Sequence, residues 1–496
     1  MNAWLPLLVV LSSLLPGLII FFLAEEQTRA RIALNMAGAL IKLALVAIMV
    51  WGVYHGRVFE ARLPLLPGLE LALQADALAM LLVVLSSLLW LVTTVYAIGY
   101  LENSPHRSRF FGFFSLCVTA TVGVALSDNL ITFLLFYELL TLSTYPLIVH
   151  RGTEVARKAA RLYLVYTLVG GALLLLATVW LYTLAGTLEF IPRGFLSGLD
   201  EQHHGALTVI FALLIIGFGV KAAIVPLHGW LPKAMVAPAP VSALLHAVAV
   251  VKAGAFGIVR VVYDIYGVEF ANSLGLLTPL AVAASFTIIY GSVRALYQDD
   301  LKRRLAYSTV SQVSYIALGA AVAGPLATIG GIVHLVHQGL MKITLFFCAG
   351  NLAETLGIHK ISEMNGVGRR MPRTMAAFTL GAFGMIGVPP LAGFISKWYL
   401  GLGALETGQE WVILVLIGSS LLNAAYFLPI LYAAWFKSPP SNWPQEHSFG
   451  RKETAWALLL PPMITALLAL ATGLLANALF SPLQWAIFIT SLEYPP

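Results

Sequence analysis

Ionisable side chains inside long apolar segments are the residues of this sequence best suited to chemistry. Glu138 lies in FLLFYELLTL, where it is the sole carboxylate deep within an apolar segment, and Lys221 lies in GFGVKAAIVP. Lys252 follows in HAVAVVKAGAF and Lys397 in GVPPLAGFISK. A charged side chain at the centre of a membrane helix costs about 2.5–3.5 kcal/mol on insertion scales, so such residues are functional candidates by default. These four side chains therefore predict a functional site.

Histidines extend this set. His246 precedes Lys252 by six residues, and the segment HLVHQGLMKITLFF carries His334, His337 and Lys342. At about 100° per residue the last three fall within an arc of about 140°, so they can share one broad side of a helix. Buried lysines lose their proton readily, and histidine titrates near neutrality. The sequence therefore predicts a proton relay whose members are Glu138, Lys221, Lys252, Lys397, His246, His334, His337 and Lys342.

Metal and cofactor chemistry has little support in the sequence. The two cysteines, Cys117 and Cys348, both lie in apolar runs, which argues against disulfides, thiolate zinc sites and iron–sulfur clusters. One buried carboxylate offers too few oxygen ligands for a dedicated calcium or magnesium site. No hydrolase or nucleotide-binding motif is found. We therefore expect no metal, no cofactor and no nucleic acid partner, and a transporter subunit rather than a self-sufficient enzyme.

The composition places these residues in a membrane. Of 496 residues, 59% are hydrophobic and 10% charged, and the mean hydropathy is +0.87, whereas about a quarter of the residues in soluble domains are charged. Apolar stretches repeatedly reach the roughly 20 residues that a spanning helix needs. We predict an all-α membrane protein with fourteen spans, at 4–23, 32–54, 76–99, 110–127, 129–149, 162–186, 206–227, 241–259, 273–293, 305–323, 326–350, 375–400, 411–436 and 455–480.

The distribution of basic residues supports this division. Of the 29 lysines and arginines, 20 lie in connections after odd-numbered spans, with Arg451 and Lys452 among them, and four lie in connections after even-numbered spans. The other five lie inside spans. Under the positive-inside rule the odd-numbered connections are cytoplasmic and both termini are outside. The predicted location is the inner membrane of a bacterial or archaeal cell.

Three pairs of short segments indicate an internal repeat. PLHGWLPK at 226–233 matches PLAGFISK at 390–397, ELLTLST at 138–144 matches RRLAYST at 303–309, and SALLHA at 242–247 matches SSLLNA at 419–424. The matches occur in the same order, so they relate spans 4–8 to spans 9–13. Because each unit has an odd number of helices, five, the second copy inserts into the membrane in the opposite orientation, as in many transporters. The predicted parts are 1–109, 110–263 (first repeat), 264–436 (second repeat) and 437–496.

Prolines interrupt two of these spans. Pro226 frees the carbonyl of Ala222 beside Lys221, and Pro389 and Pro390 free those of Met385 and Ile386. Unpaired backbone at membrane depth is tolerated only inside protein or against a water-filled cavity. We therefore predict that spans seven and twelve are broken helices in the interior, although a transmembrane proline can also mark a simple kink. The role of Lys42 in span two stays open between a subunit contact and a snorkelling side chain.

Several long motifs resemble one family. FYELLTLSTYPL, KAAIVPLHGWLPKAMVAPAPVSALLHAVAVVKAG, LKRRLAYSTVSQ, HQGLMKITLFFCAGN and GVPPLAGFISKW are similar to the antiporter-like subunits of the complex I and Mrp antiporter superfamily, over about residues 70–440. Within it, the similarity is greatest to the D-type subunits of Mrp sodium/proton antiporters. The resemblance implies a fourteen-helix core, a pair of Glu138 with Lys221, a central Lys252 and a terminal Lys397. Gln338 departs from several relatives, which have a histidine there.

The function expected from this resemblance is proton translocation within a multi-subunit cation (Na⁺)/H⁺ antiporter. One alternative is a proton-pumping membrane-arm subunit of a complex I-like NADH:quinone oxidoreductase or a membrane-bound hydrogenase. A further alternative is a subunit of an inorganic-carbon transporter. One buried carboxylate faces five intramembrane lysines, so charge balance is expected to come from other integral membrane subunits. The predicted partners are these subunits, the lipid bilayer, protons and sodium.

Overall fold

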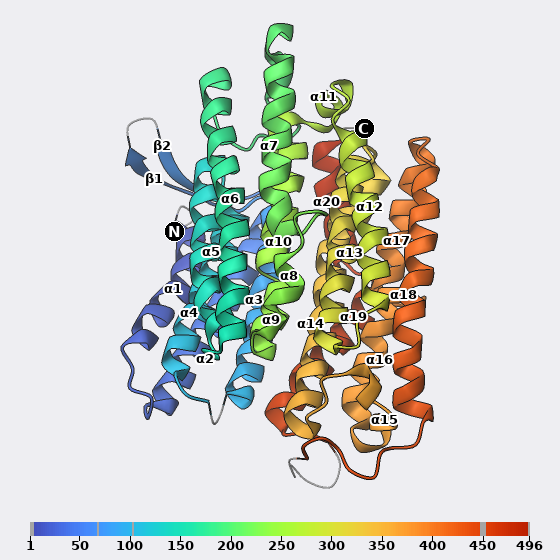
Figure 1. Ribbon diagram of the computed structural model, residues 1–496. Coiled ribbons are helices and arrows are strands. Elements are labelled where there is room, and N and C mark those ends of the chain that lie inside the picture. Colours follow the sequence, from blue (N-terminus) through green and yellow to red (C-terminus); the bar gives the residue numbers. More distant parts are fainter. Residues whose placement is uncertain (1–3, 67–68, 102–103, 447–452, 495–496) are drawn as a thin grey trace.

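The computed structural model describes residues 4–66, 69–101, 104–446 and 453–494, so Arg451 and Lys452 lie outside the described residues. Most described elements are helices that run along one common direction (Figure 1). The predicted helical membrane fold is confirmed at this level. Among the described residues, 11 helices are long and apolar enough to cross a membrane.

The N-terminal part contains a small sheet besides its helices. The elements are α1 (Leu5–Phe21), α2 (Thr28–Tyr54), β1 (Glu60–Leu66), β2 (Leu69–Gln74) and α3 (Ala77–Tyr100). β1 and β2 pair antiparallel, so the prediction of a purely α-helical protein is wrong here. Strands of six or seven residues are far shorter than a membrane span, and a search for apolar segments of span length does not detect them.

The helices of the predicted first repeat follow. They are α4 (Arg107–Leu126), α5 (Leu130–Val149), α6 (Glu154–Ala185), α7 (His204–Ala222), α8 (Trp230–Lys233), α9 (Ala239–Ala247) and α10 (Val250–Arg260), which continues as the π-helix η5 (Val261–Tyr266), with 3₁₀ turns η2 (Leu196–Gly198), η3 (Glu201–His203) and η4 (Ala234–Val236). The Asn129 side chain accepts a hydrogen bond from the backbone N–H of Thr132 and so caps α5. The chain therefore divides between the predicted spans four and five.

The predicted second repeat contains one long, buried helix, α14 (Pro325–Leu356). Its other helices are α11 (Val268–Ser273), α12 (Leu277–Leu296), α13 (Leu301–Ala321), α15 (Val367–Arg370), α16 (Pro372–Ile386), α17 (Ala392–Glu406) and α18 (Trp411–Phe436), with the 3₁₀ turn η6 (Ile361–Glu363). The apolar core of α14 is entirely buried, and α14 packs against α3, α9, α13, α16, α17, α19 and α20. This central position gives its polar residues many neighbours.

The C-terminal part extends beyond the predicted spans. The span expected at 455–480 is α19 (Trp456–Leu474), and a further helix, α20 (Pro482–Glu493), follows it. The chain turns before Ser481, whose hydroxyl accepts from the backbone N–H of Gln484, and Pro482 occupies the first turn of α20. A serine cap followed by proline is a strong start signal for a helix. α20 therefore extends the C-terminal part toward the end of the bundle where α1 begins (Figure 1).

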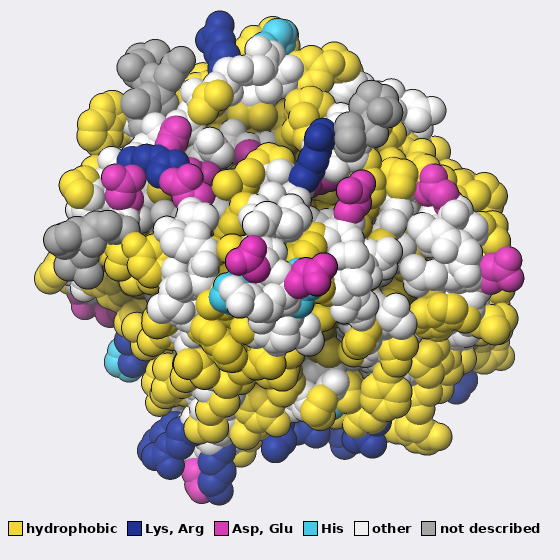
Figure 2. Space-filling view, turned by 90° about the horizontal axis from the view of Figure 1, so that it is seen from above, with side chains coloured by type: hydrophobic (Ala, Val, Ile, Leu, Met, Phe, Trp, Pro, Cys, Tyr) yellow, Lys and Arg dark blue, Asp and Glu magenta, His cyan; other side chains and the backbone are white. Residues whose placement is uncertain are grey.

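Acidic side chains are gathered on the end of the bundle that carries the hairpin (Figure 2). Arg62 of β1 is ion-paired with four of them, namely Glu60, Glu70, Asp128 and Glu189. These contacts tie the hairpin to the loops before α5 and after α6. The hairpin therefore closes one end of the first group of helices.

Candidate functional site

The structure places the predicted relay residues in the interior of the bundle. The side chains of Lys221, Lys252 and Lys342 are fully buried. Those of His246, His334 and His337 are also fully buried, on α9 and α14. Glu138 on α5 and Lys397 on α17 are half-buried. Burial of six ionisable side chains in one bundle is costly, and it matches the expected behaviour of an intramembrane functional site.

The break between α16 and α17 forms as the prolines predict. α16 ends at Ile386, and Gly387 adopts a left-handed conformation with φ of 94°. Lys397 Nζ donates to the freed backbone carbonyls of Met385 at 3.1 Å and Ile386 at 2.8 Å, and to Ser420 Oγ at 2.9 Å. The break therefore supplies the oxygen atoms that hold the Lys397 ammonium group.

Lys221 lies at the corresponding break of α7. The helix ends at Ala222, and Ala223 has a left-handed φ of 58° before the chain passes Pro226. Lys221 Nζ donates to the backbone carbonyl of Tyr137 and lies 3.3 Å from the centroid of that ring. A cation over an aromatic face is stabilised by the ring quadrupole.

Glu138 and Lys221 are neighbours without direct contact. The two charges are close enough to interact electrostatically, yet no ion pair joins them among the described residues. Glu138 Oε1 has no hydrogen-bond partner in the described part of the chain, and its carboxylate packs against Gly171 of α6. The carboxylate is therefore confined by packing against α6, and Thr141 of α5 also interacts with it.

A third break, which the sequence did not predict, lies beside Lys252. The expected span at 241–259 is divided into α9 and α10 at Val248 and Ala249. No proline or glycine marks this position, so the sequence carries no local signal for it. Lys252 lies in the first turn of α10, and its Nζ has no hydrogen-bond partner as far as the structure describes the chain. An unpaired buried ammonium group is expensive, so Lys252 occupies a position that packing alone does not explain.

The histidines of α14 extend from Lys252 toward Lys397. His334 interacts electrostatically with Lys252, and its Nδ1 lies 2.8 Å from Ser396 Oγ on α17. The Tyr315 ring of α13 lies 5.0 Å from the His334 ring and 5.7 Å from Lys397 Nζ. His334 and Tyr315 therefore stand between the central and the terminal lysine. Tyr315 was not among the predicted site residues.

The other histidines have different surroundings. His246 stacks on Phe346 with ring centroids 4.5 Å apart, and its backbone carbonyl accepts from Gln338 Nε2 at 3.4 Å. The His337 ring lies beside the backbone of Ala392 at the start of α17. The Gln338 amide therefore contacts the C-terminal end of α9. His337, the preceding residue of α14, supplies the titratable side chain in this part of the helix.

Lys342 contacts residues that the sequence reasoning missed. Its Nζ donates to Ser308 Oγ of α13 at 2.6 Å and to the backbone carbonyl of Leu305 at 3.2 Å. Ser308 in turn lies next to Tyr426 of α18. Ser308 falls in RRLAYST, one of the repeated segments, so the repeat itself was a usable signal. Neutral hydroxyl groups carry no charge signal, which is why they were overlooked.

Lys42 fits neither of the roles that were left open for it. Its side chain is fully buried, so it neither snorkels to the interface nor contacts a partner. Its Nζ donates to Ser13 Oγ of α1 at 2.7 Å and lies 5.1 Å from the Trp90 ring centroid. Ser13 Oγ is also 2.8 Å from Thr119 Oγ1 of α4. Lys42 therefore joins the N-terminal helices α1, α2, α3 and α4.

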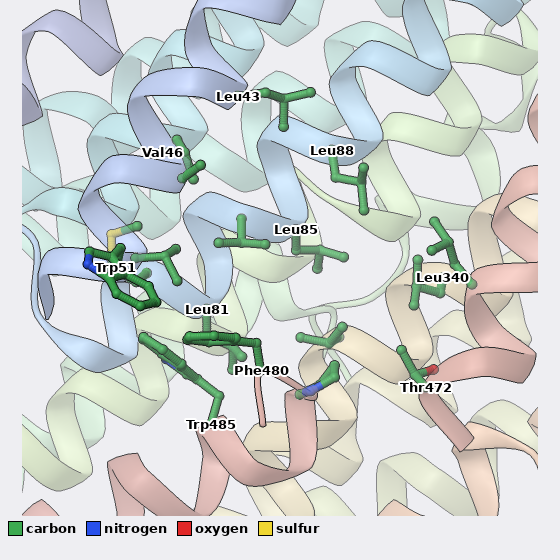
Figure 3. A pocket seen from close by; sticks show the side chains of 17 residues that line it. Leu43, Val46, Trp51, Leu81, Leu85, Leu88, Leu340, Thr472, Phe480 and Trp485 are labelled. Carbon is green, nitrogen blue, oxygen red and sulfur yellow. The ribbon is translucent and has the colours of Figure 1, made fainter. Parts of the chain in front are cut away.

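Two of the pockets formed by the described residues lie near the site. One, of about 440 Å³, is lined by apolar side chains of α2, α3, α14, α19 and α20, among them Trp51, Leu85, Leu340, Phe480 and Trp485 (Figure 3). It contains no ionisable side chain and is not part of the relay. The other, of about 610 Å³, lies between α17 and α18 and is lined by Lys397 and Ser420. The terminal lysine therefore opens onto space at the edge of the bundle.

The fold and the site define a class of protein: a multi-pass integral membrane protein whose broken helices bring lysines and histidines together in its interior. Residues 127–423 match the family model described as NADH:quinone oxidoreductase/Mrp antiporter, TM. The chain therefore belongs to the NADH:quinone oxidoreductase/Mrp antiporter family.

Two curated relatives cover nearly the whole chain. It is 35% identical to the N subunit of the NADH-quinone oxidoreductase of Desulforudis audaxviator, over 97% of each chain. It is 30% identical to the D subunit of the Na(+)/H(+) antiporter of Bacillus subtilis, over 94% of this chain and 93% of the relative.

Solved structures share the fold. A chain of the Mrp complex from Dietzia sp. DQ12-45-1b is similar with a TM-score of 0.87 at 24% identity, covering 100% of this chain and 98% of that one. A chain of respiratory complex I from Thermus thermophilus gives a TM-score of 0.82 at 23% identity and covers 100% of each chain. At these identities the similarity concerns the fold.

Proposed function

We propose that the chain is a proton-translocating subunit of a multi-subunit sodium/proton antiporter in the inner membrane of a bacterial or archaeal cell. The observation that carries the proposal is the Lys397 ammonium group, which is bound by two carbonyls freed at a helix break and lies beside a pocket. This arrangement suits a group that gains and loses a proton near the exit of a path. The 30% identity to the D subunit of a sodium/proton antiporter supports the assignment to sodium/proton exchange.

The proposed topology has fourteen crossings. Three are added to the 11 helices that meet the length and hydropathy criteria: α1, which has 17 residues, α13, which begins with a basic cluster, and the broken pair α16 and α17. Spans 4–8 and 9–13 form the inverted repeat, and both termini lie outside. The parts are 1–109, 110–263, 264–436 and 437–496. The similar position of the breaks beside Lys221 and Lys397 supports this division.

In the proposed mechanism a proton enters one half-channel, reaches Lys252 and leaves by Lys397. His246, His334, His337 and Lys342 supply intermediate positions. Lys252 has no hydrogen-bond partner among the described residues and is therefore free to change its protonation state. The arrangement of His334 between Lys252 and Lys397 supports this order.

Glu138 and Lys221 act as the gate in this mechanism. When Lys221 is ionised it is drawn toward Glu138, and the change of pairing alters the charge that neighbouring groups experience. Two unit charges 4 Å apart interact by about 4 kcal/mol at an effective dielectric constant near 20. This energy corresponds to about three pKa units at 1.36 kcal/mol per unit. Formation of one such pair is therefore strong enough to gate a proton.

A second candidate is a proton-pumping subunit of a redox-driven complex. The specific observation in its favour is the 35% identity to the N subunit of an NADH-quinone oxidoreductase. The same relay serves both functions, because the chain moves protons in either case and only the driving reaction differs.

Purification of the native complex distinguishes the two functions. Its subunits would be identified, and the complex would be reconstituted in vesicles loaded with a pH dye. The antiporter function predicts sodium-dependent proton exchange by the complex and none by the lone chain. Proton pumping that requires an electron donor, without sodium exchange, would move the assignment to the redox-driven class.

A further inference from the structure

A row of hydrogen bonds leads away from Lys342 across three helices. Lys342 Nζ of α14 donates to Ser308 Oγ of α13 at 2.6 Å, and Ser308 Oγ lies 2.7 Å from Tyr426 Oη of α18. Tyr426 Oη donates to Asn423 Oδ1, one turn earlier on α18, at 2.5 Å. These distances are those of strong hydrogen bonds. The row contains two hydroxyl groups, which can both accept and release a proton.

The same row continues to Lys397. Asn423 Nδ2 donates to the backbone carbonyl of Met385 at 2.9 Å, and Lys397 Nζ donates to this same carbonyl at 3.1 Å. Ser420, on the same helix as Asn423, accepts from Lys397 Nζ at 2.9 Å. The row therefore ends at the break between α16 and α17, where the terminal lysine is held.

From Lys342 to Asn423 the donors in this row can all point in one direction, and Lys397 donates to the Met385 carbonyl from the other end. An ammonium group only donates, so Ser308 Oγ accepts from Lys342. The Tyr426 hydroxyl donates to Asn423, which leaves its oxygen free to accept from Ser308. Each hydroxyl therefore has an acceptor on the side toward Lys397. A row with aligned donors is prepared for a proton to move along it in that direction.

The hydrogen bonds of this row lie in the interior of the protein, not at its surface. The side chains of Ser308, Tyr426 and Asn423 are all fully buried. Buried polar groups need partners, and a purely structural network would satisfy that need. This network differs because it has an ionisable amine at each end, and both amines belong to the predicted relay.

We propose that Ser308 and Tyr426 carry protons between Lys342 and Lys397, and that Asn423 positions them. The inference rests on the proposed proton translocation and adds residues to it. The Lys342 ammonium group gives a proton to Ser308 Oγ as the hydroxyl proton of Ser308 passes to Tyr426 Oη. As Tyr426 Oη accepts that proton, its own phenolic proton leaves through water to the neutral Lys397 amine, so neither hydroxyl becomes charged. Lys342 becomes neutral, Lys397 becomes positively charged, and both hydroxyl groups are restored.

Asn423 has a different part in this transfer. A neutral amide does not readily take up and release protons, so Asn423 does not carry the proton itself. Its side chain accepts from the Tyr426 hydroxyl and donates to the Met385 carbonyl, and so fixes the position of both groups. The last transfer needs water between Tyr426 and Lys397. The pocket of about 610 Å³, which Lys397 and Ser420 line, has room for water at the Lys397 end of this transfer.

The test uses the complex purified from the native host and reconstituted in vesicles with a pH dye. Tyr426→Phe removes one hydroxyl and keeps the ring, and Ser308→Ala removes the other. The matched control is Tyr432→Phe, because Tyr432 lies on the same helix but is 59% exposed. Subunit composition and thermal stability are measured for every variant, so that a failure of assembly is recognised.

We expect Tyr426→Phe and Ser308→Ala each to slow proton movement at least about tenfold, or about 1.4 kcal/mol of barrier. The double variant should be no slower than the slower single variant, because residues that act in one path are not additive. The control should keep the parental rate.

Parental rates in Tyr426→Phe and Ser308→Ala would overturn this inference, as would losses that add in the double variant. These outcomes differ from a failure of the proposed function. In that case the parental complex itself would move no protons under either sodium or redox drive.

Discussion

Replacement of Gly171 by alanine tests how the Glu138 carboxylate is positioned. Gly171 lies in α6, and a Cβ at this position would be 2.8 Å from Cδ of Glu138 and closer still to its Oε1. Ordinary contacts of a Cβ begin at 3.4 Å, so the carboxyl group must move by roughly 0.6 Å or more. The carboxylate is the far end of a flexible side chain, and it can therefore move while the helices stay in place.

The expected effect on stability is small and favourable. Alanine is preferred over glycine in a helix by about 1 kcal/mol, which offsets the cost of moving the carboxylate. The expected effect on transport is larger, because a misplacement of about 1 Å in a reacting group can cost on the order of 100-fold. We therefore predict a loss of about 10- to 100-fold in proton movement with intact assembly.

The assay is dye-monitored proton movement by the reconstituted complex, together with thermal unfolding. Gly205→Ala in α7 is the matched control, because a Cβ at Gly205 meets no atom within 4 Å. The control changes helix propensity without touching Glu138. Transport at the parental rate by a stable Gly171→Ala variant would refute the idea that the position of this carboxylate gates the relay.

Three further predictions concern charged side chains. Lys397→Ala should abolish ion-coupled proton movement in an assembled complex, whereas Lys397→Glu should keep part of it; normal transport by the alanine variant would contradict the exit role. Glu138→Gln with Lys221→Met should assemble better than either single variant yet stay inactive, because each single change leaves an uncompensated charge; an active double variant would make the pair structural. Burial raises the pKa of Asp128, in the loop before α5, to about 7 against the opposing effect of Arg62. The folded protein therefore retains a proton that the unfolded chain releases near its ordinary value of 3.8, and the free energy of unfolding should fall as pH rises between these values. Thermal unfolding of the parent and of Asp128→Asn at several pH values checks this, since the variant should show a weaker dependence on pH than the parent.

The helices and their two proline breaks were predictable because they depend on local signals. Pro389 and Pro390 have no backbone N–H, so the carbonyls of Met385 and Ile386 had to find another donor. Lys397, a few residues further on, supplies it. Strong local chemistry of this kind can be read directly from a sequence.

Features that depend on packing between distant segments were not predictable in the same way. The break beside Lys252 has no proline or glycine, and the β-hairpin is too short for a search based on span length. The contact of Lys342 with Ser308 joins residues 34 positions apart. A direct ion pair between Glu138 and Lys221 also depends on the relative position of two helices. Among the described residues the two side chains form no such pair, and Lys221 donates to the backbone of Tyr137 instead.

Lys252 offers the most direct test of the proposed relay. Its Nζ is fully buried and lacks a hydrogen-bond partner within the described part of the chain, so Lys252→Met removes an ionisable group without breaking a hydrogen bond there. The purified complex with this substitution should keep its subunits, yet vesicles that contain it should show no sodium-dependent or redox-driven change in internal pH. The parental complex should show that change under one of the two conditions. Proton movement at the parental rate by an intact Lys252→Met complex would contradict a proton path through the centre of this protein.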